Sequence, residues 1–175
     1  MGQWLGLRAP EPLAAHHRVD AFDSGVASLD DWLKRRAANN QASGASRTFV
    51  ATDEKQTVVG YYALASSAVA PVLTPGRFRR NMPDPIPVVV LARLAVARSH
   101  QGQGLGRVLF QDAALRVIGA ADSIGIRGML VHAISAEAKA FYLQLGLEVS
   151  PLEPMTLMTT LADLRAAVAP EASRN

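Results

Sequence analysis

The sequence predicts a single α/β domain built around one mixed sheet. Strand-like and helix-like segments alternate along its 175 residues, which is typical of helices packed on a sheet. The length and a hydrophobic content of 49% suffice for one well-filled core and are small for two domains. We expect the domain to span residues 1–169 and the polar tail over 170–175 to be disordered.

The N-terminal part predicts a strand followed by a helix. The strand is expected near residues 4–8. Ser28 precedes two acidic residues and apolar residues at helical spacing, which predicts a helix over 29–39. Residues 40–46, rich in Asn, Ser and Gly, are expected to form a loop.

Two β-prone segments, 47–52 and 57–65, are joined by a polar turn and predict a hairpin. Tyr61 and Tyr62 are neighbours in its second arm, so they must point to opposite faces of the sheet. Prolines over residues 71–87 then argue against a regular helix or a central strand there.

The second half of the chain predicts alternating strands and helices. Each segment is recognised by its apolar spacing and by flanking residues such as glycine and the helix caps Ser135 and Thr160. The expected elements are a buried strand over 88–96, a helix over 105–120, a strand over 129–134, a helix over 136–145, a strand over 155–159 and a helix over 161–168.

Composition excludes several classes of function. The chain has no cysteine, so it has no disulfide, thiolate metal site or cysteine nucleophile. No apolar stretch approaches the roughly 20 residues of a membrane helix, and the N-terminus lacks the pattern of a secretory signal. We therefore expect a soluble cytoplasmic protein.

A strand followed by a glycine-rich turn is the segment that suggests chemistry. Three glycines between Gln101 and Arg107 let main-chain N–H groups converge at the mouth of a helix, where a diphosphate is the natural ligand. A dinucleotide-binding pattern would need glycine at Arg107, and a P-loop would need Gly-Lys-Ser or Gly-Lys-Thr. Taken alone, the turn is as compatible with a tight strand-to-helix connection as with a phosphate site.

Two motifs together are more specific. Gln101, Gly104 and Gly106 form a Gln-x-x-Gly-x-Gly pattern that resembles the acetyl-CoA motif of GNAT N-acetyltransferases. Ala138, Phe141 and Tyr142, on a later helix, resemble that family's Ala-x-x-Phe-Tyr. The resemblance implies the GNAT fold, which is a mixed, mostly antiparallel central sheet with a splayed strand pair, flanked by helices on both faces.

The resemblance also implies roles for residues. Tyr142 is the expected general acid, because a phenol with a pKa near 10 is protonated at neutral pH; its alternative role is packing on the core. Ser135 stands where many members have Asn, and we expect it to cap a helix. The residues expected to hold acetyl-CoA are Leu94, Ala95, Val96, Gln101, Gly102, Gln103, Gly104, Leu105, Gly106 and Arg107.

Further segments look like the TacT-type GNAT toxins of toxin-antitoxin pairs. That resemblance implies acetylation of the α-amino group on charged tRNA, a block of translation, a ribbon-helix-helix antitoxin and a homodimer. The segments that carry it are Phe22-Asp23-Ser24-Gly25, Leu29-Asp30-Asp31-Trp32-Leu33, Asn40-Gln41, Ser46-Arg47-Thr48-Phe49-Val50, Gly60-Tyr61-Tyr62, Pro85-Ile86-Pro87-Val88 and Arg93-Leu94-Ala95-Val96.

Positive side chains would then contact tRNA phosphates, although such a cluster taken alone is more often a solvated face. Arg93 is expected near the acceptor end, or else in an internal ion pair or at the sheet edge. His132 is expected to be a buried, hydrogen-bonded residue, with proton removal through water as the alternative. We expect no metal. The candidate tRNA contacts are Lys34, Arg35, Arg77, Arg79, Arg80 and Arg93.

Two other functions remain open at this point. The first is acetylation of a small amine or a protein N-terminus with the same cofactor site. The second is a module that binds acyl-CoA or RNA without catalysis.

Overall fold

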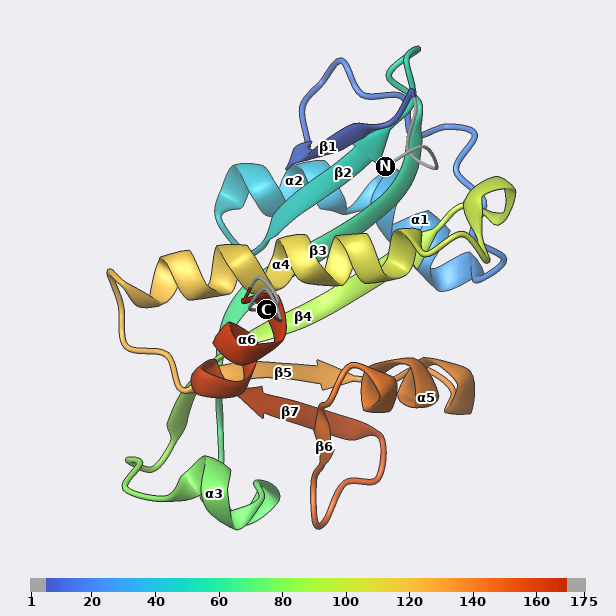
Figure 1. Ribbon diagram of the computed structural model, residues 1–175. Coiled ribbons are helices and arrows are strands. Elements are labelled where there is room, and N and C mark those ends of the chain that lie inside the picture. Colours follow the sequence, from blue (N-terminus) through green and yellow to red (C-terminus); the bar gives the residue numbers. More distant parts are fainter. Residues whose placement is uncertain (1–5, 170–175) are drawn as a thin grey trace, which may run out of the picture. The chain divides into compact units, whose positions relative to one another are not determined.

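The computed structural model describes residues 6–169 and contains a seven-stranded sheet in the order β1-β2-β3-β4-β5-β7-β6 (Figure 1). The chain forms two compact units, one of residues up to 65 with 91–113 and one of residues 66–90 with those from 114 onward. The expected tail over 170–175 lies outside the described residues. No helix in the described range is long and apolar enough to cross a membrane.

Most elements match the expected ones in type and position. The strands are β1 (Arg8–Pro12), β2 (Arg47–Thr52), β3 (Val58–Val69), β4 (Ile86–Val96), β5 (Gly128–His132), β6 (Glu148–Val149) and β7 (Thr156–Thr160). The helices are α1 (Ala27–Arg35), α2 (Ala37–Ser43), α3 (Gly76–Arg79), α4 (Leu105–Ala121), α5 (Ala136–Gln144) and α6 (Leu161–Val168), with 3-10 turns η2 (Pro71–Leu73) and η3 (Arg98–His100).

The first unit is built on the antiparallel β2–β3 hairpin, which confirms the expected pairing. Tyr61 and Tyr62 are fully buried and contact different helices. The Tyr61 hydroxyl donates to the carbonyl of Leu29 in α1 (2.6 Å), whereas the Tyr62 hydroxyl donates to Asp112 in α4. Helices therefore cover both faces of this hairpin.

The second unit is built on β5, β6 and β7, which pair in antiparallel fashion. The expected caps are confirmed, because Ser135 accepts from the N–H of Ala138 (3.0 Å) and Thr160 accepts from that of Asp163 (3.1 Å). In β5, a Cβ added at Gly128 would lie 2.0 Å from the carbonyl oxygen of Thr159. Only glycine fits at that point of the sheet.

The helix expected over 29–39 is wrong in its extent. It is divided at Arg36 into α1 and α2, and α2 occupies much of the segment expected as a loop. In α2, the Gln41 side chain donates to the carbonyl of Leu13 (2.6 Å) and accepts from the N–H of Thr48 (2.9 Å). Tertiary hydrogen bonds thus override helix continuity. The expected cap Ser28 is also wrong, since α1 begins after Val26.

Other boundaries differ as well. The first strand begins at Arg8, and part of its expected range lies outside the described residues. The proline-rich segment contains η2 and the four-residue α3. Pro87 lies inside β4, near its start, where its carbonyl accepts from the N–H of Arg127 (2.8 Å). The two-residue β6 was not expected, because so short a strand has no readable periodicity.

Candidate active site

The glycine-rich turn presents main-chain N–H groups at the start of α4. Gly102 and Gly104 have φ of 75° and 86°, the left-handed region that glycine adopts without strain. A Cβ at Gly102 would meet nothing within 4 Å, so the turn is open on that side. Within the described range, no protein acceptor takes the N–H groups of residues 102–107. This arrangement fits the diphosphate of acetyl-CoA.

The side chain of Gln101 has a structural role in this turn. Its amide nitrogen donates to the carbonyl of Ser24 and to that of Val96, each at 2.8 Å. Both amide hydrogens are therefore used within the protein. The sequence predicts Gln101 as a cofactor residue, but its bond to Ser24, which lies 77 residues earlier, has no local signal in the sequence.

The remaining expected cofactor residues lie at the end of β4, within the turn and in the first turn of α4. Leu94, Ala95 and Val96 are the last three residues of β4. Ala95 is buried in the core against α1, and its half-buried neighbours alternate to the other side of the strand. Gln103 and Arg107 are exposed, and the first turn of α4 contains Leu105, Gly106 and Arg107.

Tyr142, in the second unit, is a buried residue of α5 with an exposed fraction of 7%. Its ring makes an edge contact with that of Phe141, with centroids 5.1 Å apart. Burial raises the pKa of the phenol to about 12, because the charged form would lose its solvation. Tyr142 is therefore protonated at neutral pH, as an acid must be.

The other two tyrosines of the chain have structural roles. Tyr61 packs on Phe22 and stacks on Trp32, and burial raises its pKa above the ordinary value. Tyr62 stacks on Phe49 and is bonded to Asp112. Each hydroxyl donates a hydrogen bond within the first unit, that of Tyr61 to the carbonyl of Leu29 and that of Tyr62 to Asp112.

His132 differs from the expectation of a buried residue. It is the last residue of β5 and is exposed, because the strand ends there. The expected hydrogen bond is present, since Nδ1 lies 3.0 Å from the hydroxyl of Thr156. An exposed imidazole can exchange protons with water, so the alternative role stays open.

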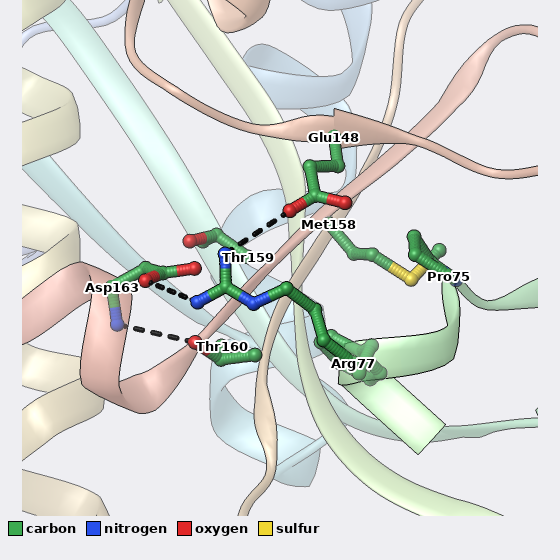
Figure 2. Close-up of a pocket in the computed structure, with 8 residues that line it drawn as sticks. Pro75, Arg77, Glu148, Met158, Thr159, Thr160 and Asp163 are labelled. Atoms are coloured by element: carbon green, nitrogen blue, oxygen red, sulfur yellow. Dashed lines mark hydrogen bonds and ion pairs between the residues drawn. The ribbon is translucent and has the colours of Figure 1, made fainter. Parts of the chain in front are cut away.

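The three arginines of the α3 segment are not equivalent. Arg77 bonds Asp163 (2.8 Å) and Glu148 (3.4 Å), which raises the pKa of its guanidinium (Figure 2). Arg79 is exposed and donates to the carbonyl of Thr74 (3.0 Å). Arg80 is exposed and has no ion pair within residues 6–169. Of the three, Arg77 is the one whose guanidinium forms ion pairs with carboxylates of the protein itself, within residues 6–169.

The first unit carries the other positive candidates. Lys34 and Arg35 are exposed in the last turn of α1, as the polar face predicted. Arg93 lies over the ring of Trp32, 5.1 Å from its centroid, and donates to the carbonyl of Ala92. No carboxylate pairs with Arg93 in the described part of the chain, so the expectation of an internal ion pair is wrong.

Glu11, His16 and His17 bring three potential metal ligands within 4.8 Å of one another. His17 accepts from the N–H of Ala14 at Nδ1 (2.9 Å), so the proton sits on Nε2 and is donated to Glu11 (2.7 Å). Both ring nitrogens of His17 are therefore occupied. A metal ion would have to break one of these bonds.

Comparison with known proteins assigns the family. The model of the acetyltransferase (GNAT) domain matches residues 44–149, which include the glycine turn and Tyr142. The chain belongs to the GNAT acetyltransferase family. A relative from Mycobacterium tuberculosis (strain ATCC 25618 / H37Rv), named tRNA-acetylating toxin, is 51% identical over 163 residues, which cover 93% of this chain and 98% of the relative.

Solved structures of toxins have the same fold as this GNAT chain. AtaT complexed with acetyl-methionyl-tRNAfMet matches with a TM-score of 0.85 and 27% identity, covering 93% of this chain and 99% of AtaT. A mutant AtaT toxin bound to acetyl-CoA and the C-terminus of the antitoxin AtaR matches with a TM-score of 0.81 and 26% identity, covering 94% and 99%. The family match confirms the expected GNAT fold, and this neighbour of the same fold binds acetyl-CoA.

Proposed function

We propose that this acetyltransferase transfers the acetyl group of acetyl-CoA to the α-amino group of an amino acid on charged tRNA, and so blocks translation. The observation that carries the proposal is the 51% identity, over almost the whole chain, to a protein named tRNA-acetylating toxin. The likeness to AtaT in complex with an acetylated aminoacyl-tRNA supports it.

The reaction does not require a strong general base from the protein. Acetyl-CoA supplies an activated acyl group as a thioester. An α-amino group has a pKa of about 8, so an appreciable fraction is already neutral and nucleophilic near pH 7. The residues of the turn hold the diphosphate, and the N–H of a β4 residue among Leu94, Ala95 and Val96 polarises the carbonyl that is attacked.

Tyr142 provides the proton that the departing sulfur needs. Its pKa of about 12 keeps the phenol protonated at the pH of the cell. His132, exposed at the end of β5, is available to accept the proton of the amine through water. Neither role requires a metal ion.

Exposed positive side chains contact the tRNA. Lys34 and Arg35 on α1, and Arg79 and Arg80 in the α3 segment, are exposed and suited to phosphate contacts. Arg77 is a weaker candidate, because a phosphate would have to compete with Asp163 and Glu148. Arg93 lies over Trp32 and has no carboxylate partner among residues 6–169, so it is suited to the acceptor end.

The partners follow from the same proposal. The protein acts in the cytoplasm, where charged tRNA is found, and works as a homodimer. A ribbon-helix-helix antitoxin holds it in check. The structure of AtaT with the C-terminus of the antitoxin AtaR supports an antitoxin as partner.

The test is incubation of the protein with acetyl-CoA and a mixture of charged tRNAs, followed by identification of the acetylated amino acids. We expect acetyl-aminoacyl-tRNA with the native protein, and about 100-fold to 1,000-fold slower formation with Tyr142→Phe at matched concentration. Turnover of free amines or peptides, without modification of charged tRNA or inhibition of a cell-free translation extract, would favour the other acetyltransferase function.

A further inference from the structure

Asp30 is a buried carboxylate without a role in the chemistry above. It lies in the first turn of α1 and has an exposed fraction of 9%. One of its oxygens, Oδ1, accepts from the N–H of Ser24 (3.0 Å) and from the hydroxyl of Ser24 (2.6 Å). A buried carboxylate is costly unless it is hydrogen-bonded, so this pair of bonds fixes Ser24 firmly.

Ser24 in turn connects Asp30 to the cofactor turn. Its carbonyl accepts one hydrogen of the Gln101 amide at 2.8 Å, and the carbonyl of Val96 accepts the other at 2.8 Å. The first residue of the turn is therefore held from two sides. One side is the end of β4, and the other is the segment that Asp30 anchors.

A second connection lies beside the first. The N–H of Arg98 donates to the carbonyl of Asp23 (2.8 Å), and its guanidinium contacts the Asp23 carboxylate (3.2 Å). Gly25, with φ of 89°, allows this approach, because a Cβ there would lie 3.2 Å from Nε of Arg98. The segment 22–25 is thus joined to the polypeptide on which the turn begins.

We propose that Asp30 is a positioning residue for acetyl-CoA, acting through Ser24 and Gln101 to hold the glycine turn in its open conformation. Gly102 and Gly104 lose much conformational freedom when the turn is ordered. Fixing Gln101 beforehand removes part of that cost from ligand binding. The inference concerns the acetyl donor alone, so it holds whichever amine is the acceptor.

Calorimetry on Asp30→Ala, Asp30→Asn and Asp31→Ala tests this role. Asp31 is an exposed carboxylate in the same helical turn and serves as the matched control. We expect Asp30→Ala to weaken acetyl-CoA binding about tenfold. Asp30→Asn should recover most of the affinity, since its amide oxygen still accepts both bonds, and Asp31→Ala should bind as the native protein does.

A second ligand separates positioning from general damage. S-acetyl-pantetheine lacks the diphosphate, so Asp30→Ala should bind it as well as the native protein does. In the protein without ligand, amide hydrogen exchange of residues 102–104 should be faster in Asp30→Ala than in Asp31→Ala. Equal losses for both ligands, or native affinity for acetyl-CoA, would overturn the proposal.

A further variant keeps the test decisive if Asp30→Ala does not fold. Gln101→Met removes the final link and retains a side chain of similar length. We expect the same selective loss of acetyl-CoA affinity in this variant. A folded Gln101→Met protein with native affinity for acetyl-CoA would contradict the proposed connection.

Discussion

The turn over residues 101–106 offers main-chain N–H groups, whereas α5 offers a side chain, the phenol of Tyr142. The turn presents these N–H groups because its glycines adopt positive φ and because Gln101 holds its position. The protonation of Tyr142 depends on its surroundings, because burial raises the pKa of the phenol to about 12. Substitutions in the turn should therefore change the affinity for acetyl-CoA, and those at Tyr142 should change the rate of the chemical step.

The largest effect is expected at Tyr142. Tyr142→Phe removes only the hydroxyl, so kcat should fall about 100-fold to 1,000-fold, with little change in the Kd for acetyl-CoA. Steady-state kinetics and calorimetry on the same preparation measure both quantities. A variant that keeps native kcat would show that another group protonates the sulfur.

The complementary effect is expected in the turn. Gly102→Ala disfavours the left-handed conformation by about 1–2 kcal/mol, so the free turn should leave the conformation that binds acetyl-CoA and the Kd should rise about tenfold. At saturating acetyl-CoA, kcat should stay within twofold of the native value. Gly119→Ala is the matched control, because that glycine lies inside α4 and has open space around its Cβ position. A turn that tolerates alanine would mean that its conformation does not govern binding.

A smaller effect should depend on salt. Charge reversal at Arg79 and Arg80 should raise the KM for charged tRNA several-fold near 0.1 M salt and reduce its dependence on salt, while the Kd for acetyl-CoA stays constant. Lys55→Glu, in the exposed turn between β2 and β3, is the control. An unchanged KM would remove the α3 segment from the tRNA interface.

The smallest effect is expected from pH, because the phenol of Tyr142 should not titrate between about pH 7 and pH 10. Tyr142 acts in its protonated form, and its pKa is raised, so protonation is complete below pH 10 and is lost only as the pH rises through about 12. The ratio of kcat between the native protein and Tyr142→Phe should therefore be constant from about pH 7 to pH 10. A ratio that declines with an apparent pKa below 10 would place the phenol in a more polar environment.

The sequence predicts those features of the fold that depend on residues close together in the chain, such as helix caps and tight turns. Ser135 and Thr160 were recognised as caps because a cap and its N–H lie three residues apart. The glycine turn was recognised for the same reason, since its conformation is written in consecutive residues. The expected positions of Gly102, Gly104 and Tyr142 needed no knowledge of distant contacts.

Contacts between distant segments could not be read in this way. Arg77 meets Glu148 and Asp163, which lie 71 and 86 residues further along the chain. The break of the first helix at Arg36 depends on bonds that Gln41 makes to other elements. The exposure of His132 depends on where β5 ends, and strand ends are weakly marked in a sequence.

The close contact between Gly128 and Thr159 bears on how such genes lose activity. Any side chain at Gly128 must push β5 away from β7, although the residue lies in neither of the motifs by which the family is recognised. A single-base change there could silence the protein while every diagnostic residue stays intact. A survey that identifies functional genes by the two sequence motifs alone would count such an inactive gene as functional.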